Sequence, residues 1–493
     1  MTTSHKTLPC IPITEDTVDG AIAAMQNAAQ FADVFELRID FLKQIELSRL
    51  LAAKTRPVIV TNRPTRQGGH WNKSEQERIS HLREAIQLGA DYVDIEDDSV
   101  ARLGPKGSSG LIISNHDLSG TPSDLKPLYQ EIVGMGADIV KIVTTANTIL
   151  DTIPVFDLLD SAKMPTIGLA MGEPGVITRI LASRHDAFLT FGSLEKGKES
   201  AAGQITARDL LETYRIHDIT KGTALYGVIA NPVAHSLSPS IHNAAFKELD
   251  IDARYLPLLV HNVQEFLEEF NDFGFGGFSV TLPHKQSVMP CLDEIDPLAE
   301  KIGAVNTVVY RKGRSLGSNT DCTAAVKSLE KAIVPEKLDG NVCLIVGAGG
   351  VARAVAFGLK EKNCRLIIAN RTYERGVALA EDVGAKAVRL DEIPSVEADV
   401  IVNATSVGMY PKVDHSPVPK AALKDGVVVF DTIYNPQVTL MLRQAKASGC
   451  RAVTGLDMFV SQAAEQFQIW TQQSAPSDVM KSVLVNTLTK ASS

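Results

Sequence analysis

The chain is poor in cysteine and has no long hydrophobic run. Its six cysteines are scattered among 493 residues without any C-x-x-C pair, which argues against a disulfide framework and against a metal site. Residues 1–6 form no apolar signal core, and no apolar run reaches membrane length. We therefore predict a cytoplasmic protein that binds neither a metal nor a membrane. The alternative is a plastid protein whose transit peptide has been removed.

The chain also lacks an excess of positive charge. Its 49 lysines and arginines stand against 58 aspartates and glutamates, which gives a net charge of −9. Nucleic-acid-binding surfaces are basic, so we expect no nucleic-acid partner. An acidic substrate must then be held by local arginines and lysines rather than by the field of the whole protein. A length of 493 residues predicts two to four domains.

Short apolar runs alternate with amphipathic stretches from residue 8 to about residue 192. Eight of the runs have the length of a strand; they lie at 8–13, 34–39, 58–61, 92–95, 111–114, 139–143, 166–170 and 188–191. Helical patterns such as 75–88 and 124–135 separate them. Eight alternating strands and helices predict a parallel (β/α)8 TIM barrel. The alternative is an open doubly wound sheet, but this half has no glycine-rich phosphate turn.

The strand pattern resets near residue 220, where we expect a domain boundary. A second α/β block has strand-like runs at 226–230, 254–259, 277–281 and 307–311, and a third has them at 342–346, 365–369, 400–402 and 427–430. Helical patterns at 458–473 and 477–489 end the chain. We therefore predict an α/β protein with a barrel over 1–218, a second domain over 224–330 that the helices at 456–490 complete, and a Rossmann domain over 335–455.

A lysine lies inside one of the apolar runs of the first half. Lys141 is the fourth residue of Asp-Ile-Val-Lys-Ile-Val, and His116 follows the preceding predicted strand. An apolar setting and nearby cations favour the neutral amine, which attacks a ketone to form a Schiff base. A histidine, which titrates near neutrality, can then remove a proton from the neighbouring carbon. The alternative is a lysine at a sheet edge that reaches solvent, but His116 and the arginines after other strands favour a catalytic role.

Residues 8–210 resemble type I 3-dehydroquinate dehydratase. The matching strings include Glu-Leu-Arg-Ile-Asp from Glu36, Ser-Asn-His-Asp from Ser114, and Met-Gly-Glu-Pro-Gly-Val-Ile-Thr-Arg up to Arg179. The resemblance implies that Lys141 forms the imine and that His116 removes the C2 proton and assists loss of the C1 hydroxyl as water. The substrate would be held by polar groups and one aromatic ring, namely Glu36, Arg38, Arg63, Arg179, Phe191, Ser200 and Gln204.

One position departs from the pattern of that family. The family usually has a glutamate just before a Gly-Gly pair, where it supports the histidine, but this chain has Gln67. A glutamine can hydrogen-bond to the imidazole but cannot stabilise an imidazolium by charge. We therefore expect a lower pKa for His116 than a glutamate would give, and a slower dehydration.

A glycine turn follows the first strand of the third block. Gly347, Ala348, Gly349 and Gly350 lie between that apolar run and a helical pattern, and such a turn lets a pyrophosphate approach a helix N-terminus. About twenty residues on, where NAD-binding proteins have an acidic residue, the chain has Asn370, Arg371 and Thr372, with Arg375 nearby. Cations at this place favour NADP over NAD. The alternative is that the two arginines are simply solvated charges at a helix start.

The second half also carries short polar groups around one lysine and one aspartate. Lys285 paired with Asp321 would keep its charge and could exchange a proton with a carbonyl being reduced. Residues 224–493 resemble shikimate dehydrogenase, which implies that these two residues are the catalytic pair. It also implies a shikimate site and an NADP site. The shikimate site would comprise Ser236, Ser238, Thr281, Asn306, Tyr434 and Gln462 in addition to Asp321. The NADP site would comprise the glycine turn, Asn370–Thr372 and Arg375, together with Asn403, Thr405, Ser406 and Gly455.

The two resemblances describe consecutive reactions of aromatic amino-acid biosynthesis. The dehydratase (a lyase) converts 3-dehydroquinate to 3-dehydroshikimate, and the dehydrogenase (an oxidoreductase) reduces 3-dehydroshikimate to shikimate with NADPH. The expected partners are therefore these small molecules. Two alternatives remain: a fusion whose dehydrogenase prefers quinate, and a regulator that senses metabolites without catalysis. The presence of Lys141, His116, Lys285 and Asp321 argues against the regulator.

Overall fold

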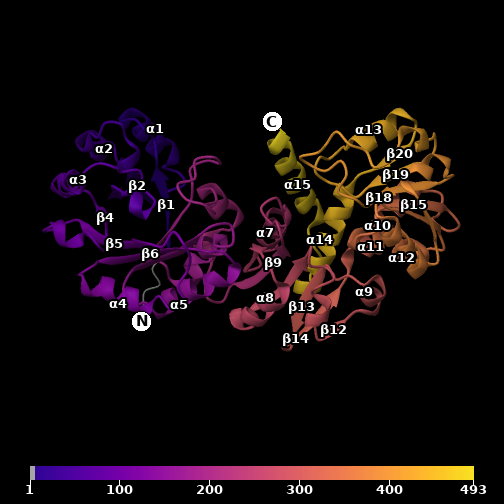
Figure 1. Cartoon of the computed structure of the whole chain (residues 1–493), viewed down its shortest axis with the longest axis horizontal. Coiled ribbons are helices and arrows are strands. Elements are labelled where there is room, and N and C mark those ends of the chain that lie inside the picture. The colour runs from indigo at the N-terminus through magenta and orange to yellow at the C-terminus, as the bar shows by residue number, and fades with distance from the viewer. Residues whose placement is uncertain (1–5, 493) are drawn as a thin grey trace. The chain divides into compact units, whose positions relative to one another are not determined.

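The computed structural model describes residues 6–492 and divides into two compact units (Figure 1). The first extends to Ala224 and includes the short segments Pro232–Ala234 and Leu256–Asn262, and the second contains the rest of the chain. In the part that the structure describes, we find no helix with the length and apolar character needed to cross a membrane.

The first unit is a barrel of eight parallel strands in the order β7-β6-β5-β4-β3-β2-β1-β8. The strands are β1 (Leu8–Ile13), β2 (Val34–Arg38), β3 (Val58–Thr61), β4 (Tyr92–Glu96), β5 (Gly110–His116), β6 (Ile139–Thr145), β7 (Thr166–Met171) and β8 (Leu189–Phe191). The two ends of the sheet meet where the backbone N–H of Phe188 donates to Thr166 O at 2.8 Å. The barrel is thus nearly closed, and the predicted (β/α)8 fold is confirmed.

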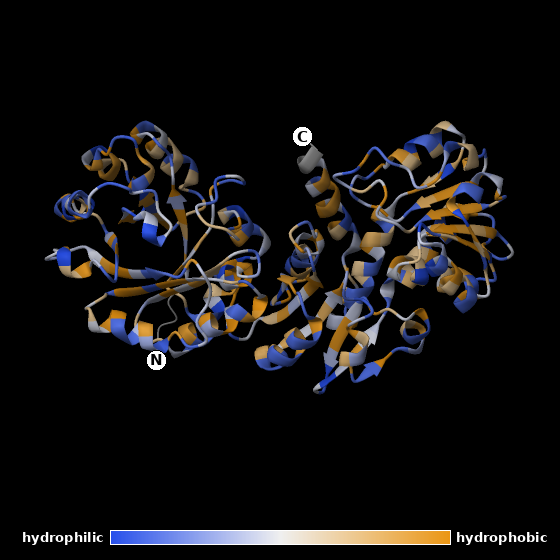
Figure 2. Ribbon diagram, viewed as in Figure 1, coloured by the Kyte–Doolittle hydropathy of each residue, from blue (hydrophilic) through white to orange (hydrophobic). Residues whose placement is uncertain are grey.

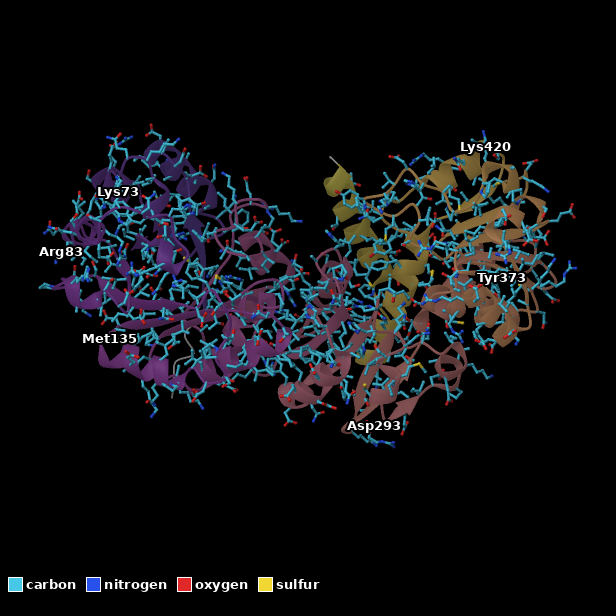
Figure 3. The ribbon with its side chains drawn as sticks, viewed as in Figure 1. Lys73, Arg83, Met135, Asp293, Tyr373 and Lys420 are labelled. Atoms are coloured by element: carbon cyan, nitrogen blue, oxygen red, sulfur yellow. The ribbon has the colours of Figure 1, made fainter. Side chains whose placement is uncertain are left out.

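Helices cover the outside of the barrel (Figure 1). They are α1 (Val18–Ala28), α2 (Leu47–Ala52), α3 (Glu75–Gln87), α4 (Lys126–Gly134), α5 (Ile153–Ser161) and α6 (Val176–Ile180). Hydrophobic residues gather on the strands in Figure 2, and a large cluster of buried residues lies between strands and helices. Charged side chains such as Lys73 and Arg83 are exposed at the periphery (Figure 3).

The interior of the barrel changes character along the strands. Alternate residues of each strand point inward. At the amino ends of five strands the inward side chains are apolar, and they are Val34, Ile59, Tyr92, Ile112 and Ile139. Two residues further along the same strands, the inward side chains are polar and buried, and they are Glu36, Thr61, Asp94, Ser114 and Lys141. The apolar layer closes the bottom of the barrel and supports a polar layer near the carboxyl ends of the strands.

Two six-stranded sheets follow along the chain, and apart from Ala224 and residues 256–259 their strands lie in the second unit. The first has the order β10-β9-β11-β13-β14-β12, and its strands are β9 (Ala224–Ala230), β10 (Ala253–Leu259), β11 (Phe275–Val280), β12 (Glu294–Ile295), β13 (Thr307–Arg311) and β14 (Arg314–Ser318). The helices of this part are α7 (Ser238–Glu248), α8 (Val263–Glu269), α9 (Pro297–Ile302) and α10 (Thr320–Ile333).

The other sheet is parallel and has the order β17-β16-β15-β18-β19-β20. Its strands are β15 (Val342–Val346), β16 (Arg365–Ala369), β17 (Lys386–Val388), β18 (Val400–Asn403), β19 (Val428–Asp431) and β20 (Arg451–Val453). The remaining helices are α11 (Gly350–Glu361), α12 (Tyr373–Val383), α13 (Leu440–Ala447), α14 (Gly455–Thr471) and α15 (Ser477–Ser492). This is the predicted Rossmann arrangement. The sequence pattern missed β12, β14, β17 and β20. Three of these strands have only two or three residues, too few to show a period, and β14 (RSLGS) has a single apolar side chain.

Candidate active sites

Lys141 lies in the polar layer of the barrel, where its ammonium meets two carboxylates. Its Nζ is 2.8 Å from Asp94 Oδ2 and 3.1 Å from Glu36 Oε1, and it stands 4.7 Å from the centre of the Phe191 ring. The side chain is almost fully buried. The expectation of an apolar setting with nearby cations is therefore wrong in one respect. Phe191 supplies an apolar face, but two carboxylates bond to the amine directly.

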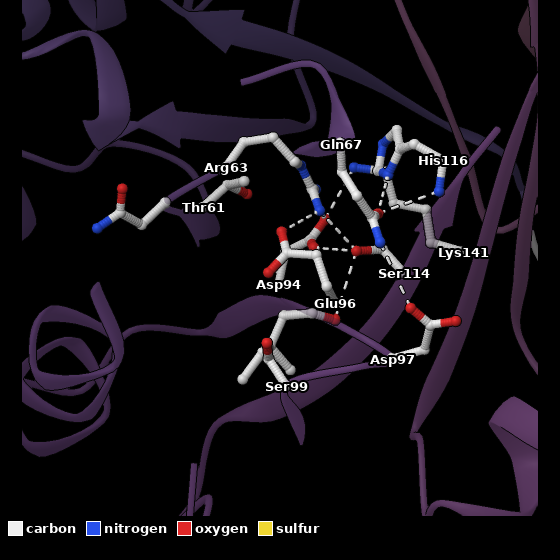
Figure 4. Close-up of polar contacts among 12 residues, drawn as sticks. Thr61, Arg63, Gln67, Asp94, Glu96, Asp97, Ser99, Ser114, His116 and Lys141 are labelled. Carbon is white, nitrogen blue, oxygen red and sulfur yellow. Dashed lines mark hydrogen bonds and ion pairs between the residues drawn. The ribbon is translucent and has the colours of Figure 1, made fainter. Parts of the chain in front are cut away.

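Asp94 joins Lys141 to a buried network that the sequence analysis missed. Arg63 Nη2 lies 2.8 Å from Asp94 Oδ2, and its Nη1 lies 2.6 Å from Glu96 Oε1 (Figure 4). Ser114 Oγ donates to Asp94 Oδ1 at 2.6 Å. Burial opposes ionisation of Asp94, but Arg63 and Lys141 outweigh it and hold the pKa of this carboxyl well below its usual range. The signal was present, because Asp94 and Glu96 have the same parity in an otherwise apolar strand.

His116 ends β5 and contacts Gln67 (Figure 4). Its Nδ1 and its backbone N both lie 3.1 Å from Gln67 Oε1. Removal from water, with added repulsion from Arg63 and Lys141, lowers the pKa of the imidazole well below its ordinary value. Burial is the main cause of this lowering, and a higher pKa with a glutamate at position 67 stays a prediction. The ring is therefore neutral near pH 7 and able to accept a proton.

The predicted residues of the first half surround one cavity of about 230 Å³. Its lining includes all nine of them, namely Glu36, Arg38, Arg63, His116, Lys141, Arg179, Phe191, Ser200 and Gln204. Ser200 and Gln204 lie in the loop after β8, where the backbone N–H of Ser200 donates to Gln204 Oε1 at 2.9 Å. Two of the three arginines are already paired, since Arg38 binds Asp40 through Nε at 2.9 Å and Nη2 at 2.7 Å, and Arg63 binds the network above.

Arg179 is the exception among the arginines of the cavity. It lies on α6, is 1% exposed, and its Nε and Nη2 have no hydrogen-bond partner among residues 6–492. Burial lowers the pKa of its guanidinium to about 10. An uncompensated buried charge is costly, so its retention points to an anion that binds there. A guanidinium binds a carboxylate through two parallel hydrogen bonds, so a carboxylate substrate fits this place.

The second half brings Lys285 and Asp321 together. Lys285 Nζ lies 2.5 Å from Asp321 Oδ2, and both side chains are largely buried. Asn319 caps α10 by accepting from the backbone N–H of Asp321 at 3.1 Å, which fixes that residue at the helix start. The ion pair can hold the lysine as a proton donor next to a bound carbonyl.

Besides Asp321, the predicted substrate residues of this half come from five segments. Thr281 follows β11, whose Val280 N–H donates to Asn306 O at 2.8 Å. Asn306 in turn binds Thr320, the neighbour of Asp321, through Nδ2 at 3.0 Å. Ser236 and Ser238 lie at the start of α7, and Ser238 is buried. These contacts place Thr281 and Asn306 close to the ion pair.

The helix α14 carries Gln462 and positions Tyr434, the two remaining predicted substrate residues. Gln466 donates to Asn306 O at 3.1 Å, and Gln462 lies one turn earlier on the same helix. Tyr434 stacks on Phe459 of α14 with ring centres 4.1 Å apart, and burial raises its pKa to about 12. Gln462 and Tyr434 are thus held on one end of α14 near the carboxyl end of β19.

The glycine turn lies at the carboxyl edge of the parallel sheet. β15 is central, the chain continues to β16 on one side and to β18 on the other, and ligands bind at such a switch point. Gly347 has a φ of 128°, and a side chain there would meet Ala404 O at 2.7 Å. Gly349 caps α11, and nothing lies within 4 Å of the place where its side chain would be. The turn therefore leaves room for a pyrophosphate at the helix N-terminus, with Ala348 and Gly350 beside it.

The loop after β16 suits a phosphorylated nucleotide. Arg371 and Arg375 are exposed there, and Asn370 Nδ2 donates to Thr372 O at 2.7 Å, which fixes the loop. No acidic side chain stands in the segment 370–372, so its chemistry fits a 2′-phosphate.

Asn403 is fully buried and supports the neighbouring loop. It donates to Asp431 Oδ1 at 3.0 Å and accepts from the backbone N–H of Thr405 at 2.9 Å. Thr405 and Ser406 follow it in the loop that faces the glycine turn, as the contact of Gly347 with Ala404 indicates. Gly455 begins α14, where a side chain would meet Thr432 O at 2.4 Å. Asn403 thus holds the loop in place through its buried hydrogen bonds, while Thr405 and Ser406 are the residues placed to contact a ligand.

No group of three or more histidine, cysteine, aspartate or glutamate side chains is placed to hold a metal ion within residues 6–492. All six cysteines are free thiols.

Four family descriptions match successive parts of the chain. "Type I 3-dehydroquinase" matches residues 9–221 and "Shikimate dehydrogenase substrate binding domain" matches residues 228–308. "Shikimate / quinate 5-dehydrogenase" matches residues 328–437 and "Shikimate 5'-dehydrogenase C-terminal domain" matches residues 455–485. The first description covers the barrel, and the other three cover the second unit.

Similar proteins match either nearly the whole chain or about half of it. The chain is 42% identical over 504 residues to the chloroplastic bifunctional 3-dehydroquinate dehydratase/shikimate dehydrogenase of Arabidopsis thaliana, a match that covers 96% of this chain and 84% of that protein. It is 42% identical over 273 residues to a shikimate dehydrogenase (NADP(+)) of Bacillus cereus, a match that covers 54% of this chain and 98% of that protein.

Two solved structures resemble the second unit. A shikimate dehydrogenase in complex with NADP+ aligns with a TM-score of 0.52 and 39% identity over 55% of this chain and 97% of that chain. The shikimate dehydrogenase of Thermus thermophilus in complex with NADP(H) and shikimate aligns with a TM-score of 0.50 and 36% identity over 54% of this chain and 100% of that chain.

Proposed function

This chain belongs to the family of bifunctional 3-dehydroquinate dehydratase/shikimate dehydrogenases, and from that premise we propose which side chains carry out each reaction. The enzyme is a lyase and an NADP-dependent oxidoreductase that catalyses two consecutive steps of the shikimate pathway. It dehydrates 3-dehydroquinate to 3-dehydroshikimate and reduces that product to shikimate. The roles of individual residues, the domain limits and the location in the cell are our proposals.

In the dehydratase, Lys141 is the nucleophile. Its Nζ adds to the ketone carbon of 3-dehydroquinate, and the carbonyl oxygen leaves as water, which gives an imine. The imine withdraws electrons from the neighbouring carbon, so the proton on C2 becomes acidic. His116, neutral because burial lowers its pKa, takes that proton and returns it to the C1 hydroxyl, which departs as water. Hydrolysis of the imine then releases 3-dehydroshikimate and restores Lys141.

Arg179 holds the substrate carboxylate. The observation that carries the proposal is its buried guanidinium with unpaired Nε and Nη2, in the same cavity as Lys141 and His116. A carboxylate bound there would satisfy both donors and anchor the ring over Lys141. Glu36, Arg38, Ser200 and Gln204 surround the rest of the cavity and are suited to the ring hydroxyls, whereas Arg63 chiefly holds Asp94 in place.

In the dehydrogenase, Lys285 donates a proton to the carbonyl oxygen as the carbonyl is reduced. NADPH supplies the hydride. Asp321, 2.5 Å from Lys285, orients the lysine and can accept a hydrogen bond from a substrate hydroxyl. Ser236, Ser238, Thr281, Asn306, Tyr434 and Gln462 bind the remaining groups of shikimate. The glycine turn would hold the pyrophosphate of NADP, Arg371 and Arg375 would hold its 2′-phosphate, and Thr405 and Ser406 would complete the pocket.

The limits of the three functional domains follow the sheets. We assign the dehydratase to 1–218, the shikimate-binding domain to 224–330 with the helices at 456–490, and the NADP-binding domain to 335–455. The division into a barrel and two further sheets supports this assignment.

The six free thiols favour a reducing compartment, so we assign the protein to the cytoplasm. The alternative is a plastid, since the Arabidopsis relative is described as chloroplastic. We expect no nucleic acid or membrane among its partners, in keeping with the net charge of −9.

A coupled assay with two variants tests the division of labour. The full chain receives 3-dehydroquinate and NADPH, and enone formation and NADPH loss are followed separately. We expect Lys141→Ala to stop both signals and to regain NADPH loss when 3-dehydroshikimate is added. We expect Lys285→Ala to form the enone without NADPH loss. Exposed Lys163 and Lys301 provide the control variants Lys163→Ala and Lys301→Ala. The assignment fails if either control behaves like its test variant, or if both test variants retain both reactions.

A further inference from the structure

Asp97 lies behind the contact between Gln67 and His116. Its Oδ1 is 3.4 Å from Gln67 Nε2 (Figure 4). Its Oδ2 accepts from Asn115 Nδ2 at 2.8 Å. The backbone N–H of Asp98 also donates to Asp97 Oδ1, at 3.0 Å. The carboxylate is thus held in place on three sides and points at the amide of Gln67.

This arrangement decides which way the Gln67 amide faces. A carboxylate accepts hydrogen bonds and a backbone N–H donates them, so each admits only one end of an amide. Asp97 requires the amide NH₂ on its side. The backbone N–H of His116, 3.1 Å away, requires the amide oxygen on the other side. Two independent neighbours therefore give the same orientation, with Gln67 Oε1 facing the histidine.

The amide orientation in turn decides the tautomer of His116. Nδ1 lies 3.1 Å from Gln67 Oε1, which can only accept, so Nδ1 must carry the proton. In a neutral imidazole the other nitrogen, Nε2, then has the free lone pair. A general base needs that lone pair, and the cavity lined by His116 is the place where the reacting carbon lies.

We infer that Asp97 is a positioning residue for the dehydration, because it holds Gln67 in the orientation that fixes His116 as the Nδ1–H tautomer with Nε2 free. The inference rests on the proposed role of His116 as general base. Asp97 does not touch the substrate cavity; it acts through the amide. A glutamate at position 67 would place a negative charge directly beside His116. In this protein the carboxylate is instead that of Asp97, and the Gln67 side chain lies between it and the histidine.

Position 67 and position 97 are consequently coupled. A glutamate at 67 would also accept from Nδ1, but its second oxygen would meet Asp97 at the 3.4 Å that now separates Gln67 Nε2 from Asp97 Oδ1. Two carboxylates at such a distance repel each other. Glutamate at 67 is therefore compatible with this site only if position 97 can donate a hydrogen bond, as asparagine does.

The test uses ¹⁵N NMR of histidine-labelled full-length enzyme, in which the His116 signals are assigned by comparison with His116→Gln. We expect a protonated Nδ1 and a free Nε2 in the unaltered chain. Asp97→Asn can donate or accept, so only the backbone N–H of His116 still favours this orientation of the Gln67 amide, and the second tautomer should become populated. The kcat of dehydration should fall by on the order of tenfold, part of the roughly 10²- to 10⁴-fold that a general base supplies, with KM unchanged. The matched control is Asp98→Asn, because the Asp98 carboxylate binds Arg66 and not Gln67.

A second pair of variants keeps the test informative if Asp97→Asn folds poorly. Gln67→Glu alone should lower kcat, and Gln67→Glu with Asp97→Asn should regain the Nδ1–H tautomer and most of the rate. Shikimate dehydrogenase activity of the same chains reports that they are folded. The inference is overturned if His116 carries its proton on Nε2, or if these variants leave tautomer and kcat unchanged. A full dehydration rate in His116→Ala would instead contradict the proposed function, whatever the tautomer.

Discussion

Asp94 Oδ2 lies 2.8 Å from Lys141 Nζ and 2.8 Å from Arg63 Nη2, so one buried carboxylate oxygen holds two cations. The arrangement keeps the lysine amine in a fixed position at the bottom of the cavity. Because Arg63 and Lys141 outweigh burial and keep the pKa of Asp94 well below its usual range, this carboxylate is a poor proton acceptor. Asp94 therefore positions the amine, and the proton that leaves Lys141 before imine formation must pass to another group.

Trapping with borohydride locates the imine. When 3-dehydroquinate is present, we expect borohydride to inactivate dehydration and to add the mass of the reduced ligand to the peptide that contains Lys141. Lys163→Ala, which removes an exposed lysine of the same unit, should be trapped as readily. Mass spectrometry of the digested protein is the measurement. An unmodified Lys141 peptide from inactivated enzyme would contradict the proposed nucleophile.

The pH profile of dehydration follows from the environment of His116. Burial, Arg63 and Lys141 lower the pKa of the imidazole, while Asp94 opposes them. A base with a lowered pKa stays unprotonated to lower pH, so kcat/KM should remain flat as pH falls through about 6.5, the usual histidine value, and decrease only below it. The profile is measured from enone formation across a range of roughly pH 4.5 to 8, which brackets that value. An acid limb above the usual histidine value would show that the ring is not the base.

Arg179→Met separates binding from stability. Loss of a charge-assisted bidentate contact, roughly 1.5–3 kcal/mol, should raise the KM for 3-dehydroquinate by about 10- to 100-fold. The same change removes a buried charge that has unpaired Nε and Nη2, so the melting temperature should stay the same or rise. Steady-state kinetics and thermal unfolding check the two effects. A lower melting temperature with unchanged KM would mean that Arg179 has a structural partner rather than a substrate.

Arg371→Ala probes the choice of nucleotide. If Arg371 binds the 2′-phosphate, its loss should raise the KM for NADPH by about tenfold, the worth of one charge-assisted hydrogen bond, and leave the KM for NADH unchanged. The control is Arg365→Ala, because Arg365 is the exposed first residue of β16. Reduction of 3-dehydroshikimate with each cofactor is the assay. An equal rise in KM for NADPH and NADH would show that Arg371 does not bind the 2′-phosphate.

The substrate preference of the dehydrogenase can be settled in the same assay. Oxidation of shikimate and of quinate, each with NADP and NAD, gives four values of kcat/KM. We expect the highest with shikimate and NADP, because the cationic segment at Arg371 and Arg375 suits the phosphorylated cofactor. A preference for quinate would favour the alternative of a quinate dehydrogenase fusion.

Several features of the fold could be predicted because they repeat along the chain. The eight barrel strands and eight of the twelve strands of the later sheets were predicted to within two residues at each end, since buried strands are continuous apolar runs. The lysine inside such a run and the glycine turn were visible for a different reason, because each interrupts an apolar strand or a helical pattern. The exposed arginines after β16 were visible because they stand where NAD-binding proteins have an acidic residue.

The sequence by itself determined the fold class and the preference for NADP, and it singled out Lys141 and Lys285 as the candidate catalytic lysines, because these depend on residue type and local order. Only the tertiary structure decided what surrounds Lys141. Asp94 and Glu36 are 47 and 105 residues away from it along the chain, yet both lie within hydrogen-bonding distance. Closure of the barrel sets these contacts, as it does the link from Asp97 through Gln67 to His116. Strand register and burial determine such pairs, and neither can be calculated from a local pattern.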